Sequence, residues 1–408
     1  MQPSSPAAVP SPLPGLVALT LAYVLSQFFR TMLAVIAPEL AGDLGLGATA
    51  LGSLSALFFI AFATAQLPVG MLLDRFGPRR TVSLVMLLAS AGAVVLATAG
   101  SPVAAYAGQV LIGLGCAPVF MGALYVVARR YPVGRFAVIS SLLLAIGQGG
   151  VLLGASPLAM AAQALGWRGA LLGVAGITLA SAGLVALLVR DPQRHAGPSE
   201  SLGEAFAGVL ATLRLRELWP ILPMSFVSYG VLVTLRGLWA GPYLADVFAL
   251  APGARGNALL GMSLAMVVGT LAYGALERRL DRRRDLVAAG TAVTVLALGG
   301  LALAPSHSLA LSATLLAVVG VTGIHFAIVM AQGRRFLPDR LIGRGLTMLN
   351  GMTFAGAAVV QVGSGVMIDV LQTRGAADAA VWTALFAALG LLLAVALAAY
   401  LRSEDRRV

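Results

Sequence analysis

The chain has 408 residues, of which 59% are hydrophobic and only 11% are charged. Soluble domains carry about 25% charged residues, so this composition excludes an ordinary soluble protein and indicates lipid surroundings. The net charge of +11 does not indicate a nucleic-acid partner, because the arginines stand between apolar runs and form no single basic face.

The long apolar runs predict membrane-spanning helices. About twenty apolar residues span a bilayer, and only helices satisfy the backbone of such a run in lipid. Residues 1–13 are uncharged and lack the basic start of a cleaved signal peptide, so we expect the first run to be retained. The sequence predicts an all-α membrane protein with twelve transmembrane helices. The runs cover approximately 14–38, 49–72, 81–99, 103–128, 137–162, 168–189, 219–244, 256–277, 286–304, 308–332, 345–370 and 378–402.

The first run contains a fixed charge, Arg30. A charged side chain near the middle of a membrane helix costs about 2.5 kcal/mol or more and faces the protein interior or a water-filled cavity. Tyr23 and Gln27 share its helical face at spacings of seven and three residues. We therefore predict that Tyr23, Gln27 and Arg30 contribute to a binding site.

The loop Gly70–Arg80 carries a recognisable motif, and Gly274–Arg284 repeats part of it at a constant offset. The first loop resembles the G-x-L-x-D-R-x-G-R-R loop of the major facilitator superfamily, with Pro78 placed between Gly77 and the arginine pair. The resemblance covers essentially the whole chain. It implies two pseudo-symmetric six-helix bundles and alternating access to a site at the midplane. It also implies gating residues in this loop and in two later ones, namely Asp74, Arg75, Arg79, Arg80, Arg135 and Arg344.

The arginines also predict the orientation. Most of them fall in alternate loops, and the opposite loops hold only Arg168, Arg255 and Arg374. By the positive-inside rule, we expect the arginine-rich loops and both termini on the cytoplasmic side of the cell inner membrane. The predicted organisation is a disordered N-terminus (1–13), an N-terminal six-helix bundle (14–190), a cytoplasmic linker (191–217), a C-terminal six-helix bundle (218–402) and a C-terminal tail (403–408).

The seventh run contains the second deep charge, Arg236, with Tyr229 and Tyr243 seven residues away on the same face. A guanidinium meets a carboxylate or phosphate with paired hydrogen bonds. We predict that Arg30 and Arg236 clamp an anion together. The alternative is that each arginine is a packing device satisfied by backbone carbonyls.

Two stretches carry a narrower resemblance. Residues Tyr23–Arg30 and Leu235–Leu244 resemble the first and seventh helices of the organophosphate:phosphate antiporters, in which the two matching arginines bind phosphate. This chain has Ile146 where that family has a histidine, and Thr31 where it has a lysine. The resemblance therefore implies an anion clamp more than it implies phosphate as the substrate.

Other polar or aromatic residues inside the runs are further candidates. Gln148 and Gln361 either line the cavity or join helices, and Trp239 either packs on substrate or on neighbouring helices. His325 is the only deep titratable group besides the arginines, and it either titrates or packs. The coupling ion is left open between a proton, a counter-anion and none.

These observations predict a secondary active transporter that moves a small organic or phosphorylated anion. We expect a lipid bilayer and a small-molecule anion as partners, a monomer, no nucleic acid, no cofactor, no bound metal and no enzyme activity. One alternative is an exporter of hydrophobic or cationic compounds. Another is a copper transporter lined by Met262, Met266, Met348 and Met352, since thioethers bind Cu(I).

Overall fold

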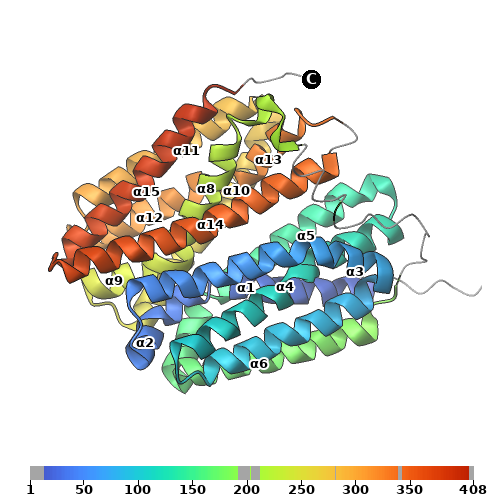
Figure 1. Cartoon of the computed structure of the whole chain (residues 1–408), viewed down its shortest axis with the longest axis horizontal. Coiled ribbons are helices and arrows are strands. Elements are labelled where there is room, and N and C mark those ends of the chain that lie inside the picture. The colour runs from blue at the N-terminus through green and yellow to red at the C-terminus, as the bar shows by residue number, and fades with distance from the viewer. Residues whose placement is uncertain (1–12, 192–202, 204–211, 281, 339–341, 404–408) are drawn as a thin grey trace, which may run out of the picture.

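The computed structural model describes residues 13–191, 203, 212–280, 282–338 and 342–403 (Figure 1). The regular elements in this described part are helices, as the sequence predicts. The first half of the chain contains α1 (Leu13–Phe29), α2 (Leu33–Leu44), α3 (Ala48–Ala97), α4 (Pro102–Arg130), α5 (Val133–Leu153) and α6 (Ser156–Leu188). The second half contains η1 (Arg216–Leu218), α8 (Leu222–Thr234), η2 (Leu235–Trp239), α9 (Ala240–Phe248), α10 (Pro252–Leu280), α11 (Arg283–Leu303), α12 (Leu309–Gly323), α13 (Phe326–Arg334), α14 (Ile342–Thr373) and α15 (Asp378–Tyr400).

The number of spans follows from helix length. Ten helices in the described part are long and apolar enough to cross a membrane, and the bent pair α1–α2 adds an eleventh. One of the ten, Leu142–Leu188, has 47 residues. At 1.5 Å per residue such a stretch is roughly 70 Å long, which is more than twice the hydrocarbon thickness of a bilayer. It therefore holds two spans, and the total agrees with the predicted twelve.

Two glycines divide the longest helices. Gly77 interrupts α3 with a φ of 79°, and Gly166 interrupts α6 with a φ of 72°. This left-handed conformation is favourable only for glycine among ordinary residues. Gly77 thereby divides α3 into two spans, and Gly166 separates the span formed by α5 and the start of α6 from the following one.

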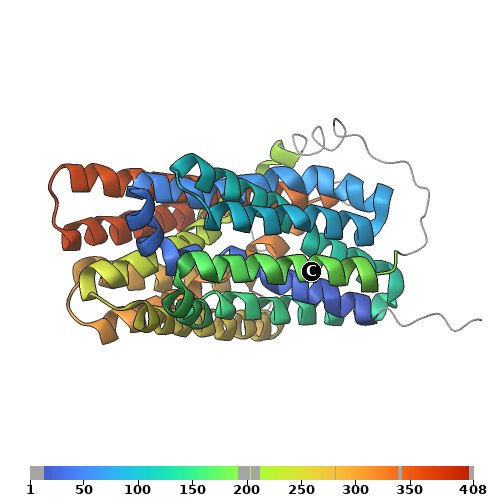
Figure 2. The same cartoon turned by 90° about the horizontal axis from the view of Figure 1, so that it is seen from below.

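The halves lie side by side as two groups of helices. Figure 1 shows the first half (blue to green) below the second half (yellow to red), and Figure 2 shows the same arrangement from below. Contacts between α3 and α14, and between α6 and α10, join the halves. The interface between the halves therefore crosses the middle of the molecule.

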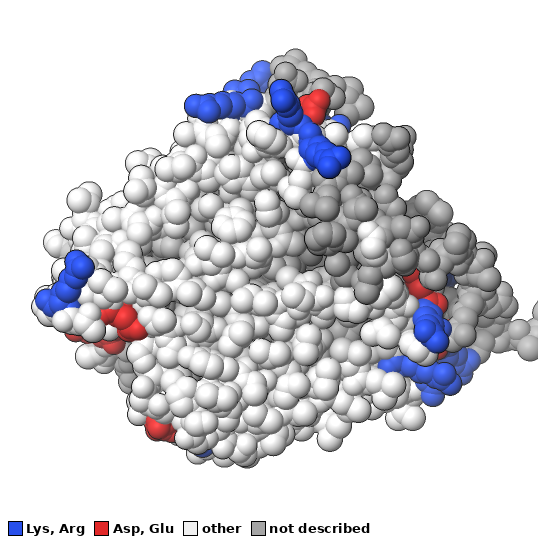
Figure 3. All heavy atoms as spheres, in the orientation of Figure 1, with Lys and Arg blue, Asp and Glu red and all other residues white. Residues whose placement is uncertain are grey.

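The surface indicates how the molecule sits in lipid. Figure 3 shows charged side chains gathered at separate ends, with a broad uncharged surface between them. Large apolar side chains are exposed to the outside, and Leu303 is 90% exposed. Such a continuous apolar surface marks contact with lipid. We call the end that carries Arg79, Arg130 and Arg283 the arginine-rich end, and the end that carries Arg168 and Arg374 the arginine-poor end.

Candidate functional site

Three spans are broken near the middle of the molecule. The first bends by 50° between α1 and α2, at Arg30, and the seventh contains the π-helix η2, which includes Arg236. The tenth is interrupted between α12 and α13, at His325. Broken helices at membrane depth occur where backbone groups serve a site or are satisfied by neighbouring protein. The three breaks therefore mark the region of a candidate binding site.

The local sequence accounts for the break at Arg30. The Thr31 hydroxyl donates to the carbonyl of Phe28 at 3.1 Å, and the Met32 amide donates to that same carbonyl at 3.0 Å. A threonine hydroxyl that bonds back to the preceding turn bends a helix. The turn at residues 30–32 sets the direction in which the Arg30 side chain leaves the backbone.

The breaks of the first and seventh spans touch across the interface between the halves. A Cβ atom on Gly237 would lie 3.2 Å from the carbonyl oxygen of Arg30, so a larger residue there would crowd the first helix. Nη1 of Arg236 donates to the carbonyl of Thr31 at 3.4 Å. The two arginines predicted to face each other thus come from adjoining backbone segments.

Arg236 is 2% exposed and is held by groups from both halves. Its Nη2 donates to the Val151 carbonyl at 2.7 Å and to Ser263 Oγ at 2.7 Å, and its Nε donates to Ser263 Oγ at 3.1 Å. We call Arg236 with Ser263 Oγ and the carbonyls of Thr31 and Val151 the Arg236 latch. These contacts match the packing alternative for Arg236 in this conformation.

The two carbonyls of the latch are left free by the helix breaks. The Val35 amide, which would bond to Thr31 in a continuous helix, donates to Met32 instead. In the same way, the Ala155 amide donates to Leu152 and leaves the Val151 carbonyl without a helical donor. An unpaired buried carbonyl costs about 1–3 kcal/mol, so Arg236 stabilises the break at Arg30 and the junction between α5 and α6.

Arg30 is in a different position. Its guanidinium carbon lies 4.5 Å from the centre of the Phe62 ring and 5.6 Å from that of Phe354. Within the described part of the chain, the buried Nε of Arg30 has no hydrogen-bond partner, and neither has Oε1 of the neighbouring Gln27. A guanidinium has five N–H donors, so Arg30 retains donors for a ligand.

Aromatic rings from both halves form a cluster that contacts this guanidinium through Phe62 and Phe354. We call Phe59, Phe62, Tyr229, Phe326 and Phe354 the Arg30 aromatic cluster. Phe354 is central: its ring centre is 4.9 Å from Phe62, 6.1 Å from Phe59 and 5.9 Å from Tyr229. The Tyr229 ring is 5.2 Å from Phe326, which follows His325 at the third break. All three breaks therefore contribute to one region.

Three other predicted aromatic residues are engaged in packing. Trp239 Nε1 donates to Ser364 Oγ at 2.7 Å. The Tyr243 hydroxyl donates to the Pro305 carbonyl at 2.5 Å and lies in the core of the second half. Tyr23 stacks on Phe120 with 4.8 Å between ring centres.

The predicted residues Gln361, Gln148 and His325 differ in their burial and in their hydrogen-bond partners. Gln361 is 0% exposed, and both atoms of its amide lack a partner in the described part. Gln148 is half-buried on α5. His325 contacts Thr291 Oγ1 at 3.2 Å through Nε2 and the Thr322 carbonyl at 2.9 Å through Nδ1. Gln361 is the amide whose hydrogen-bonding capacity is unused, whereas His325 is bonded within the second half.

The gating residues implied by the resemblance lie at the arginine-rich end. Asp74, Arg75, Arg79, Arg80 and Arg135 are exposed, and the side chain of Arg344 is outside the described residues.

The carboxylate that orders this loop is Asp191, which the sequence analysis did not single out. Asp191 Oδ1 accepts from the Arg79 amide at 2.8 Å, and the Asp191 carbonyl accepts from Arg130 Nη2 at 3.1 Å. Asp74 takes part in no hydrogen bond or ion pair with the described residues.

Contacts near the arginine-poor end join the two halves. Arg255 Nη2, which is buried, donates to Glu39 Oε1 at 2.5 Å and to the Val35 carbonyl at 3.0 Å. Asp369 on α14 accepts from the amides of Ala48 and Thr49, at 2.7 and 2.8 Å, at the start of α3. The halves are therefore joined at this end by one ion pair and by a carboxylate of the second half that caps a helix of the first.

Replacing Asp369 with alanine is expected to lower the free energy of unfolding by about 1–2 kcal/mol, the usual cost of losing a helix N-cap. Both amides at the start of α3 would lose their acceptor. Thermal unfolding of the detergent-purified protein measures the effect. Gln372→Ala, an exposed change one turn further along α14, is the matched control, and equal stability of the two variants would contradict the prediction.

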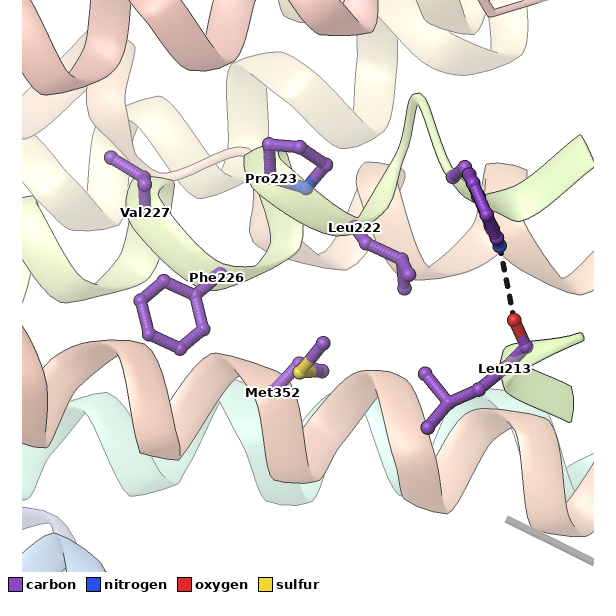
Figure 4. Close-up of a pocket in the computed structure, with 7 residues that line it drawn as sticks. Leu213, Leu222, Pro223, Phe226, Val227 and Met352 are labelled. Atoms are coloured by element: carbon purple, nitrogen blue, oxygen red, sulfur yellow. Dashed lines mark hydrogen bonds between the residues drawn. The ribbon is translucent and has the colours of Figure 1, made fainter. Parts of the chain in front are cut away.

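An apolar cavity of about 570 Å³ lies beside α8 and α14 (Figure 4). It is lined by Leu213, Trp219, Leu222, Pro223, Phe226, Val227 and Met352. Trp219 Nε1 donates to the Leu213 carbonyl at 3.0 Å, as the dashed line shows (Figure 4). Because no lining residue is charged, this cavity does not supply the anion contact that the sequence predicts.

Comparisons with known proteins agree with this architecture. The family model described as the Major Facilitator Superfamily matches residues 19–240. A bacterial homologue of the human lysosomal transporter Spinster, solved in an inward-facing and unoccupied conformation, aligns with a TM-score of 0.76. That alignment covers 98% of this chain and 100% of that one at 16% identity, which shows a shared fold.

Two curated proteins are similar in sequence. The probable galactarate/D-glucarate transporter GudP of Escherichia coli (strain K12) is 24% identical over 227 residues, 53% of this chain and 50% of that protein. Monocarboxylate transporter 11 of Homo sapiens is 30% identical over 247 residues, 60% of this chain and 49% of that protein. The chain spans about half the length of these curated relatives.

Proposed function

The chain belongs to the Major Facilitator Superfamily, a family of transporters and not of enzymes, and from this premise we propose that it moves a small organic anion across the membrane by alternating access. The anion carries a carboxylate or phosphate group that Arg30 binds. The arginine-rich end faces the cytoplasm, and the bundles 14–190 and 218–402 move against each other.

The observation that carries this proposal is the state of the Arg30 guanidinium. It lies where two broken spans meet at the interface between the halves, and its buried Nε has no partner in the described part. The cation–π contacts with Phe62 and Phe354 contribute about 0.5–2 kcal/mol and leave the N–H donors unused. A negatively charged ligand would pair those donors.

The names of two relatives point to the same class of cargo. One is named for transport of the sugar acids galactarate and glucarate, and the other for transport of monocarboxylates. The compounds in both names are organic acids, which are anionic at neutral pH. These names support a carboxylate more directly than a phosphate.

The Arg236 latch suggests how affinity changes during the cycle. In this conformation the contacts of Arg255 and Asp369 join the halves at the arginine-poor end, and Arg236 is occupied by carbonyls of the first half. Separation of the halves at that end would remove the carbonyls of Thr31 and Val151 from Arg236. Both guanidinium groups would then be available, so the pair clamps the anion in the opposite conformation, whereas Arg30 alone binds it in this one.

Purified protein in liposomes is expected to take up a radiolabelled carboxylate saturably, and unlabelled carboxylates are expected to compete. Benzoate, gluconate, sn-glycerol 3-phosphate and nitrate serve as competitors that separate the anion classes. Tetraphenylphosphonium tests the alternative of a cation exporter. Saturable uptake of labelled tetraphenylphosphonium, with no saturable uptake of the carboxylate, would reject the proposal in favour of that alternative.

A further inference from the structure

We propose that the anion is a monocarboxylate whose remaining body is flat and apolar, such as an aromatic acid. This inference rests on the proposed function and names the substrate class of the same site. It follows from the surroundings of Arg30, which offer one available cation, two aromatic rings in contact with it and three further rings packed against these in turn.

The rings present apolar surface next to the cation. Arg30, Tyr229 and Phe326 are each half-buried, whereas Phe62 and Phe354, which contact the guanidinium, are buried. A ligand whose carboxylate meets Arg30 would therefore have its body against Tyr229 and Phe326, the two partly exposed rings. Aromatic pairs add attraction beyond the area they bury, so a flat ring suits this surface.

The same surface disfavours a polyhydroxylated acid. A sugar acid needs a hydrogen-bond partner for each hydroxyl that it buries, because an unpaired buried hydroxyl is costly. Near Arg30 the candidate partners are the Ser26 hydroxyl, the Gln27 amide oxygen and the hydroxyls of Tyr23 and Tyr229. They are fewer than the hydroxyls of a sugar acid such as gluconate, which carries about five. The unpaired amide of Gln361 is two helical turns from Phe354 along α14, on the same face.

The charges favour one carboxylate over two. Arg30 has no carboxylate partner in the described part, but Arg236 donates to Ser263 Oγ and to the carbonyls of Thr31 and Val151. A second carboxylate placed among the rings would lose its hydration without gaining a cation. A dianion would therefore have to break the Arg236 latch to bind in this conformation.

Dissociation constants of the full-length protein test this inference. The probes are benzoate, cyclohexanecarboxylate, phthalate and gluconate, measured by isothermal titration calorimetry in detergent. Benzoate is expected to bind at least about tenfold more tightly than gluconate or phthalate, since one aromatic contact is worth about a factor of ten. Cyclohexanecarboxylate, which keeps the charge but not the planar ring, should fall between them.

Two variants check that the rings are responsible. Tyr229→Leu and Phe326→Leu are each expected to weaken benzoate binding by about tenfold. Phe326→Leu, which removes no polar group, is expected to leave gluconate binding unchanged. Tyr106→Leu removes a half-buried ring on α4 outside the cluster, and it should bind like the wild type.

The outcomes separate the two claims. Tighter binding of gluconate or phthalate than of benzoate, lost in Arg30→Gln, would overturn the inference and keep the proposed function. Binding of none of the four acids, or binding that Arg30→Gln leaves intact, would overturn both. Equal loss in Tyr229→Leu, Phe326→Leu and Tyr106→Leu would show that the aromatic cluster does not set the substrate class.

Discussion

Arg30→Gln is expected to lower the affinity for the anion by at least about 100-fold and to stop uptake. Each hydrogen bond to a charged group contributes about 1.5–3 kcal/mol, so loss of a paired interaction removes about 3 kcal/mol or more. Glutamine keeps a polar side chain of intermediate length but has no charge. The measurement is the initial rate of labelled carboxylate uptake into liposomes that contain equal amounts of protein.

Two further variants define the interaction. Arg30→Lys keeps the charge but loses the planar fork, so it should retain part of the binding and less of the discrimination among acids. Arg402→Gln removes an exposed arginine at the end of α15 and should transport like the wild type. Uptake by Arg30→Gln at the rate of Arg402→Gln would show that Arg30 does not bind the cargo.

Arg236→Met is expected to open the arginine-poor end and to abolish net transport. Methionine has a long apolar side chain, but it leaves the carbonyls of Thr31 and Val151 and the hydroxyl of Ser263 without their donor. Two unpaired buried carbonyls cost about 2–6 kcal/mol, enough to shift a balanced equilibrium between conformations almost completely. The halves should then separate until water reaches these carbonyls.

Spin labels measure this opening. Gly42→Cys at the end of α2 and Gln372→Cys at the end of α14 are exposed positions on opposite halves. The distance between labels on these cysteines is expected to increase in Arg236→Met, in a background in which the buried Cys116 is replaced by alanine. Ser263→Ala, which removes only the partner from the second half, should leave the distance as in the wild type. An unchanged distance in Arg236→Met would show that Arg236 does not hold the halves together.

The overall fold could be predicted from the sequence because lipid imposes simple rules. The lengths of the apolar runs predicted the number of spans. Gly77 and Gly166, which interrupt two of the helices, fall between predicted runs. The break in the first span could not be predicted, because Thr31 is an ordinary residue within an apolar run. Many threonines in membrane helices do not bend the helix, whereas the Thr31 hydroxyl donates to the Phe28 carbonyl and accompanies the bend.

The candidate site was predictable in part. A lone charge in an apolar run pointed to Arg30 and Arg236, and the structure places them on adjoining segments. The sequence did not reveal that, of the two arginines, Arg236 has hydrogen-bond acceptors for its guanidinium in this conformation, whereas the Nε of Arg30 has none in the described part. That difference depends on carbonyls 205 and 85 residues away, and a backbone carbonyl has no signature in a sequence.

The aromatic cluster and the contacts between the halves were missed for a related reason. Phe59, Phe326 and Phe354 look like any phenylalanine in a membrane helix, and only the packing of separate helices brings them together. The contact made by Asp369 was missed in the same way. Its partners are amides at the start of α3, more than 300 positions earlier in the chain.

The acceptors of Arg236 in the first half are main-chain oxygens, and this affects how substitutions at that interface accumulate. Any amino acid at position 151 that keeps the end of α5 in place presents the same oxygen to Arg236. Evolutionary drift of that side chain would therefore leave the interaction intact. Covariation between residue pairs would give no sign of it, and a search for co-evolving contacts would overlook one of the charged connections between the halves.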